Sequence, residues 1–111
     1  MRDDVRERLI EVAKLGKTIT YGELMTEFRI GRRLIGKVVG EIGDAEAEDG
    51  RPRLSTIAVR RDTGYPNPIF LNSRNIPPHV RRSLDNCDLR MTAGEREYIE
   101  TEQRNVWAYW K

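Results

Sequence analysis

The chain has 111 residues, of which 38% are hydrophobic, and this is enough for one small domain with a modest core. Twenty basic and 18 acidic residues leave a net charge of only +2, which by itself does not indicate a nucleic-acid partner. No stretch approaches the roughly 20 apolar residues of a membrane span, and the first residues lack the apolar run of a signal peptide. We therefore expect a single cytoplasmic domain, residues 1–111, with no membrane contact, and the single cysteine excludes an internal disulfide.

The charges are distributed unevenly along the chain. Residues 41–50 carry five acidic side chains and no basic one, whereas residues 1–40 and 51–90 are net basic. We interpret this acidic segment as a solvated loop that interrupts a basic body. Such a loop can also discourage nonspecific binding to nucleic acid.

Two helices are predicted near the start of the chain. Apolar residues recur at helical spacing over residues 3–15, which predicts a first helix. Thr20 and Glu23 have the spacing of a capping box, which predicts a second helix from Tyr21 to about Phe28. Tyr21 then lies at the first helical position, where free amides and the positive end of the helix dipole favour an anion such as a phosphate.

A third helix is predicted from residue 32 to about residue 42, after a glycine turn. One side of it is apolar, and Arg33 and Lys37 lie four residues apart on a different side, beside Gly36 and Gly40. Each glycine inside a helix costs about 1 kcal/mol relative to alanine, so something should require the missing side chains. Close packing against another helix and close approach to a nucleic-acid backbone are both compatible with this pattern.

The segment after the acidic loop has the pattern of a β-hairpin. Residues 54–60 form a short strand-like run, residues 62–64 a turn, and residues 69–71 a second apolar run. A hairpin after three helices is a wing, so we predict a mainly α, winged helix-turn-helix-like fold for residues 1–72. A short helix is also predicted from residue 77 to residue 84.

Residues 73–111 are predicted to form a helical extension. Thr92 and Glu95 make a second capping box, which starts a terminal helix that runs to about Trp110. The aromatic side of this helix is more typical of core packing or of a dimer surface than of a platform for stacked bases. Its apolar residues are Tyr98, Ile99, Val106, Trp107 and Trp110.

The residues of most catalytic and metal sites are missing. His79 is the only histidine, which excludes a histidine-rich metal site within one chain. We find no glycine-rich phosphate loop, no nucleophile elbow, and no carboxylate pair with the spacing of a general acid and base. We therefore predict no metal, no cofactor and no enzymatic activity. A site assembled from Glu, Asp and Arg residues far apart in the sequence remains an alternative.

Three successive motifs resemble a known family. The stretches "GKTITYGEL", "GRRLIGKVVGEI" and "RPRLSTIAVRRDTG" resemble the DNA-binding and active-site region of the alkylguanine-DNA alkyltransferases and alkyltransferase-like proteins, over about residues 16–64. The resemblance implies that Tyr21 contacts a phosphate beside the target nucleotide. It also implies that Lys37 takes the place of an arginine that enters the base stack, although lysine lacks the flat guanidinium that stacks well.

The third motif departs from the family at the active site. The Pro-Cys-His-Arg of the family falls on Ser55, Thr56, Ile57 and Ala58, so the acceptor cysteine is absent. Thr56 cannot accept an alkyl group as a thiolate would, and no histidine is present to activate it. The resemblance therefore implies a DNA-binding scaffold without the transfer activity.

Two functions of different classes remain in view. The first is a non-catalytic protein that binds DNA, most simply double-stranded DNA. The second is a protein-interaction module, for example a regulator of a nucleic-acid-acting protein or a homodimer, that uses Val106, Trp107 and Trp110 of the terminal helix. The residues predicted to bind DNA are Thr20, Tyr21, Arg32, Arg33, Gly36, Lys37, Gly40, Arg60 and Arg61.

Overall fold

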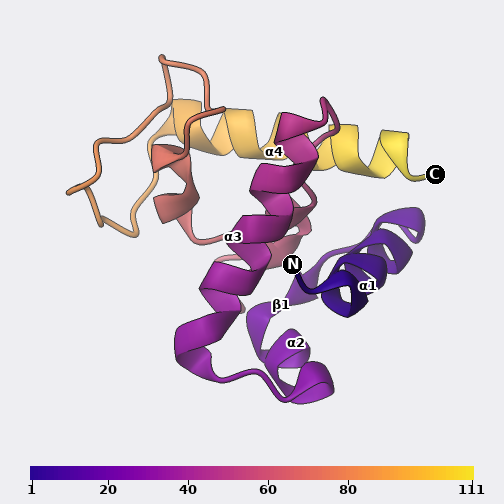
Figure 1. Ribbon diagram of the computed structural model, residues 1–111. Coiled ribbons are helices and arrows are strands. Elements are labelled where there is room, and N and C mark those ends of the chain that lie inside the picture. The colour runs from indigo at the N-terminus through magenta and orange to yellow at the C-terminus, as the bar shows by residue number, and fades with distance from the viewer.

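The computed structural model describes all 111 residues and is mainly helical (Figure 1), as predicted. Four α-helices and two short 3-10 helices surround one pair of very short strands. None of the helices has the length and apolar character needed to cross a membrane. In chain order the elements are α1 (Asp3–Lys14), β1 (Ile19–Thr20), α2 (Tyr21–Phe28), α3 (Arg32–Glu48), η1 (Leu54–Ile57), β2 (Ala58–Val59), η2 (Pro68–Asn72) and α4 (Ala93–Tyr109).

The predicted helix ends are confirmed where local capping determines them. The Thr20 hydroxyl accepts a hydrogen bond from the Glu23 amide at 3.1 Å, and the Glu23 carboxylate accepts one from the Thr20 amide at 3.3 Å. Thr92 and Glu95 form the same reciprocal pair at the start of α4. Gly16, just after α1, has a φ of +67°, the left-handed conformation that glycine adopts most easily.

The prediction of an acidic loop is wrong, because α3 continues through this segment to Glu48. The reason is a tertiary interaction. The side chain of Glu46 is fully buried, and its carboxylate accepts hydrogen bonds from the guanidinium groups of Arg6 and Arg51. A buried carboxylate needs such partners, and Arg6 lies 40 residues away in the sequence.

The predicted β-hairpin is also wrong. The two strands β1 and β2 are parallel, with Ile19 opposite Ala58 and Thr20 opposite Val59. Residues 69–71 lie instead in η2, because Pro68 favours the first turn of a helix and the Asn67 side chain accepts a hydrogen bond from the Ile69 amide. The predicted turn is present, because the amide of Arg60 donates to the carbonyl of Tyr65 at 2.8 Å and closes a compact loop.

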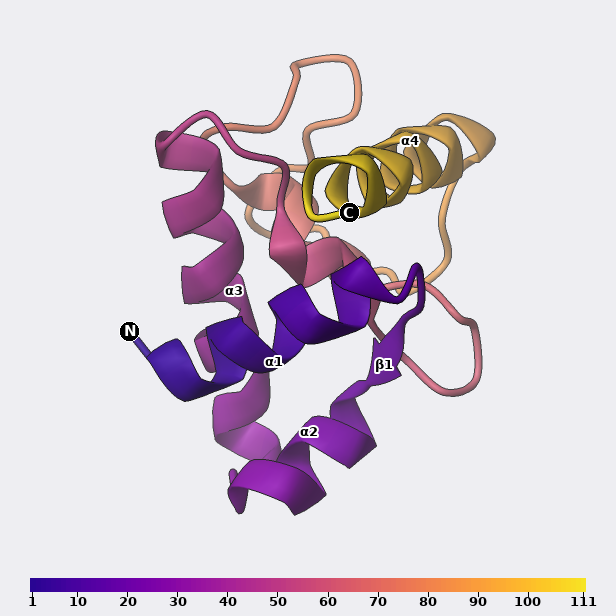
Figure 2. The same ribbon diagram turned by 90° about the vertical axis from the view of Figure 1, so that its right-hand side faces the viewer.

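The centre of the molecule is η1, against which α1, α3 and α4 pack (Figure 2). Leu54 and Ile57 of η1 are fully buried, and Val106 of α4 belongs to the same hydrophobic cluster. Residues 77–84 form turns rather than the predicted short helix. Val80 of this segment packs with Leu71 and Ile76 in a smaller hydrophobic cluster.

Candidate nucleic-acid interface and an adjoining cavity

The helices α2 and α3 follow each other in the chain. They are joined by three residues, Arg29–Gly31, which is a length typical of helix-turn-helix motifs. Arg29 ends α2 in the left-handed conformation, with φ of 53°, and Ile30 anchors the turn in the core. The turn therefore fixes the start of α3 relative to α2.

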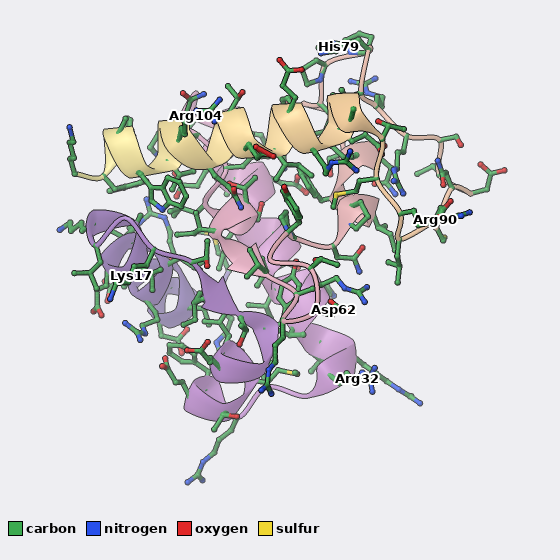
Figure 3. All side chains as sticks on the ribbon, turned by 180° about the vertical axis from the view of Figure 1, so that it is seen from behind. Lys17, Arg32, Asp62, His79, Arg90 and Arg104 are labelled. Atoms are coloured by element: carbon green, nitrogen blue, oxygen red, sulfur yellow. The ribbon has the colours of Figure 1, made fainter.

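Four basic side chains at this turn and on the following helix are exposed and belong to no ion pair. Many other arginines of the molecule have an acidic partner; Arg8 of α1, for example, binds Glu27 at 3.0 Å. Arg32 lies at the opposite end of the view from Arg104 on α4 (Figure 3). We call these four residues the α3 patch: Arg29, Arg32, Arg33 and Lys37.

The start of α2 is less suited to an anion than the sequence suggests. The carboxylate of Glu23 lies at this end of the helix and accepts hydrogen bonds from both the amide and the hydroxyl of Thr20. A negative charge there already uses the positive end of the helix dipole. Thr20 therefore acts as a cap, and a phosphate at the same place would meet a like charge.

Tyr21 connects α2 to the loop that precedes η2. Its hydroxyl oxygen accepts a hydrogen bond from the Asn67 amide at 2.9 Å, and its ring packs against the core cluster. Burial raises the pKa of the Tyr21 hydroxyl, more than the Asn67 amide and the charge of Arg60 lower it. The hydroxyl therefore stays protonated at neutral pH, and its own hydrogen can be donated to a ligand.

The two arginines that follow β2 differ in their surroundings. The guanidinium of Arg60 binds both carboxylate oxygens of Asp62, at 3.0 and 2.8 Å, and this pairing lowers the pKa of the Asp62 carboxyl. Arg61 is exposed and has no acidic partner within ion-pair distance. Of these two arginines, Arg61 is therefore the one whose charge is free for a phosphate.

The two glycines beside the α3 patch do not mark a close helix contact. A Cβ atom added to Gly36 or Gly40 would meet no atom within 4 Å outside its own helix, so the explanation by helix packing is wrong for both. The close contact lies at Gly43, where an added Cβ would be 2.2 Å from the Ser55 hydroxyl oxygen. Gly36 and Gly40 instead border an open cavity.

Substituting either of these glycines by alanine is expected to stabilise the protein. Gly36→Ala and Gly40→Ala should each raise the free energy of unfolding by about 0.5 to 1 kcal/mol, because alanine favours the helix and meets no obstacle. Urea denaturation of the two variants checks this. A loss of stability in either would show that the helix backbone is constrained at that position.

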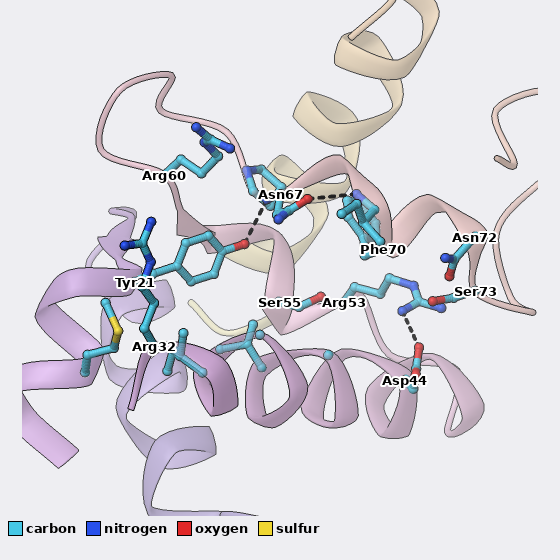
Figure 4. A pocket seen from close by; sticks show the side chains of 17 residues that line it. Tyr21, Arg32, Asp44, Arg53, Ser55, Arg60, Asn67, Phe70, Asn72 and Ser73 are labelled. Carbon is cyan, nitrogen blue, oxygen red and sulfur yellow. Dashed lines mark hydrogen bonds and ion pairs between the residues drawn. The ribbon is translucent and has the colours of Figure 1, made fainter. Parts of the chain in front are cut away.

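The cavity has a volume of about 460 Å³ and lies between α3, η1 and the segment from Arg60 to Ser73. Figure 4 shows Tyr21, Arg32 and Arg60 at one end and the ion pair of Asp44 with Arg53 at the other. The walls between them include Ile35, Val39, Ser55, Asn67, Ile69 and Phe70.

The sequence did not single out the polar residues at the inner end of this cavity. Arg53 is only 2% exposed, and one of its terminal nitrogens, Nη1, donates to Asp44 at 2.8 Å. The other terminal nitrogen, Nη2, and the hydroxyl of Ser55 are buried and have no hydrogen-bond partner. The position of Arg53 directly before the apolar run that forms η1 and β2 is the one local sign that it could be buried.

The residue aligned with the alkyltransferase cysteine does not take part in this cavity. Thr56 is fully buried, and its hydroxyl donates to the carbonyl of Arg53 at 2.8 Å. Asp44 is the single carboxylate among the lining residues, so the cavity offers no pair of acids. No group of three or more His, Cys, Asp or Glu side chains is placed to hold a metal ion.

No family is shown by comparison with known proteins: no family model matches the chain, and no curated protein or solved structure is significantly similar. The likeness to the alkyltransferases therefore rests on the sequence motifs alone.

The aromatic side of α4 is largely used inside the molecule. Val106 is fully buried, so it cannot contact a partner, and the Trp107 indole donates to the carbonyl of Lys17 at 2.9 Å. Trp110 packs against the core cluster, with the Arg6 guanidinium 5.7 Å from its ring centre. Only Tyr109 of this group is largely exposed, at 54%. The predicted core packing of this side is confirmed.

Proposed function

We propose that the protein is a cytoplasmic helix-turn-helix protein that binds double-stranded DNA without catalysing a reaction on it. The observation that carries this proposal is the α3 patch, in which four cations lie on or beside the first two turns of the helix that follows the turn, without acidic partners. In helix-turn-helix proteins the second helix enters the major groove. The patch has the charge and the position for contacts to the phosphates on either side of that groove.

The roles within the patch follow from the helix geometry. Arg33 and Lys37 lie one turn apart on the exposed side of α3 and would contact one stretch of backbone. Arg32 lies beside them at the mouth of the cavity, and Arg29 extends the patch onto the turn. Arg61, on the closed loop after β2, takes the place of a wing and would reach a neighbouring phosphate.

Fluorescence anisotropy of a labelled DNA duplex, at a low and a high salt concentration, tests the proposal. Lys37→Glu should weaken binding at low salt about tenfold, which corresponds to about 1.4 kcal/mol. It should also make the plot of the logarithm of the binding constant against the logarithm of the salt concentration less steep, by about the amount expected for the loss of one phosphate contact. The matched control is Arg104→Glu, which makes the same charge change on α4.

The control should bind within about twofold of the wild type, because Arg104 lies far from the patch (Figure 3). Equal weakening in both variants would mean that only the net charge matters, and it would contradict the assignment to α3. The absence of binding at low salt would overturn the proposal altogether. The exposed part of α4 around Tyr109 would then be the first surface to test for a protein partner.

A further inference from the structure

The inner end of the cavity contains two polar groups that the protein itself leaves without partners. They are Arg53 Nη2 and the Ser55 hydroxyl, on residues that are 2% and 5% exposed. A buried donor without an acceptor typically costs about 1 to 3 kcal/mol, so folded proteins rarely retain one. Two such groups, on residues two positions apart in the sequence, indicate that something from outside the chain completes their hydrogen bonds.

The surroundings of Arg53 define the charge of that missing group. Asp44 already accepts a hydrogen bond from Nη1 at 2.8 Å, so the positive charge of the guanidinium has its counterion. A second carboxylate at Nη2 would lie close to Asp44 in a partly desolvated site, where like charges repel strongly. An uncharged oxygen is therefore favoured over an anion at this position.

Tyr98 is the other polar side chain close to this guanidinium. Burial and the nearby Glu102 carboxylate raise the pKa of the Tyr98 hydroxyl, and the charge of Arg53 acts in the opposite direction. A weak interaction between this hydroxyl and the Arg53 side chain also lowers the pKa, but its geometry does not give Nη2 a hydrogen-bond partner. Tyr98 is not among the residues that line the cavity, so it does not compete for a ligand there.

The walls next to these groups define the shape of the ligand. Figure 4 shows Phe70 on one side of the cavity and α3 on the other, with Ser55 and Arg53 between them. On the α3 side, Ile35 and Val39 line the cavity, and Gly36 and Gly40 add no side chain to this wall. The volume of about 460 Å³ is in the usual range for small-molecule sites. A ring bound in this cavity would contact apolar side chains of both walls.

We propose that the cavity binds a small, uncharged, planar molecule that carries an amide, either a cyclic lactam or an aromatic carboxamide. The carbonyl oxygen of the ligand accepts a hydrogen bond from Arg53 Nη2, and the adjacent N–H donates to the Ser55 hydroxyl oxygen. This site is independent of the proposed DNA binding. Arg32 is the single member of the α3 patch that also borders the cavity.

Titrations followed by amide NMR test the chemical class of the ligand. The probes are benzamide, 2-pyridone and benzoate, of which benzamide and benzoate have nearly the same shape but differ in charge. Benzamide and 2-pyridone should shift the resonances of residues around Ser55 and Phe70, and benzoate should bind at least about tenfold more weakly. In the Asp44→Asn variant the preference for benzamide over benzoate should decrease, because the charge of Arg53 then lacks its counterion.

Ser55→Ala tests the role of the unpartnered hydroxyl. It should weaken benzamide binding about fivefold and yet raise the midpoint of thermal unfolding of the free protein by about 5 °C, because a buried unpaired group is removed. Ser83→Ala is the matched control, since Ser83 is exposed and does not line the cavity. This variant should change neither quantity.

Three outcomes would overturn the proposal. The first is that neither benzamide nor 2-pyridone shifts any resonance near the cavity, which would mean that water alone completes these hydrogen bonds. The second is that benzoate binds as well as benzamide. The third is that Ser55→Ala leaves benzamide binding unchanged. Lys37→Glu should leave the benzamide titration unchanged, so failure of this proposal and failure of the DNA proposal can be told apart.

Discussion

Arg82→Met is expected to lower the free energy of unfolding by about 3 to 5 kcal/mol. The Arg82 side chain is 4% exposed and binds both carboxylate oxygens of Glu95, at 2.7 and 3.0 Å. It also donates to the carbonyls of Asp88 and Arg90, so one side chain joins an irregular segment to the start of α4. Removing one partner of a buried ion pair leaves the other charge without compensation, and this is the costly kind of substitution.

Urea denaturation measures this loss, and the neighbouring arginine provides the control. Arg81 is exposed and donates only to backbone carbonyls, including that of Ile76 at 2.9 Å. Arg81→Met should therefore cost about 1 kcal/mol or less. Equal losses in the two variants would contradict the assignment of the stabilising interaction to the pair of Arg82 with Glu95.

The pH dependence of stability supplies an independent check on the same pair. The hydrogen bonds from Arg82 hold the pKa of the Glu95 carboxyl below its ordinary value of 4.5. The folded state therefore binds fewer protons than the unfolded state near this pH, so the stabilisation is complete above about pH 4.5 and is lost as the pH falls through the lowered pKa. The difference in the free energy of unfolding between the wild type and Arg82→Met should accordingly become smaller below about pH 4.5.

Local patterns in the sequence predicted the helix starts well. The boxes at Thr20 and Thr92 depend on residues three positions apart, and both are present as predicted. The three-residue turn between α2 and α3 was also visible, because a glycine interrupts the helical pattern there. Arg32, Arg33 and Lys37 of the α3 patch were predicted from the polar side of this helix, whereas Arg29, on the turn, was not.

Interactions between distant residues could not be predicted in the same way. Glu46 looked like one of several solvated acids, because its partner Arg6 lies 40 residues earlier in the chain. Likewise, the pattern at residues 54–60 suggested one strand of a hairpin, but the strand partner of β2 is β1, from which it is separated in the sequence by α2, α3 and η1. Arg53 was missed for the same reason, since its burial depends on α3, η1 and α4 together.

The second large effect is expected at the contact between α3 and η1. A Cβ atom at position 43 would lie 2.2 Å from Ser55 Oγ and 2.8 Å from Ser55 Cβ. The hydroxyl can rotate away, but Cβ is fixed to the backbone of η1, so the helix and η1 must separate. Gly43→Ala should therefore lower the free energy of unfolding by about 2 to 3 kcal/mol, although alanine is the better helix former.

A double-mutant cycle with Ser55→Gly identifies the cause of this loss. Ser55→Gly removes both atoms that the new Cβ would meet, so Gly43→Ala should cost at least about 1 kcal/mol less in that background than in the wild type. Gly40→Ala, the same substitution in open space on the same helix, should stabilise the protein. Additive effects in the cycle would contradict the clash. Since Ser55 and Arg53 reach the cavity only because η1 lies this close to α3, Gly43→Ala should also weaken benzamide binding, while the exposed α3 patch keeps its affinity for DNA.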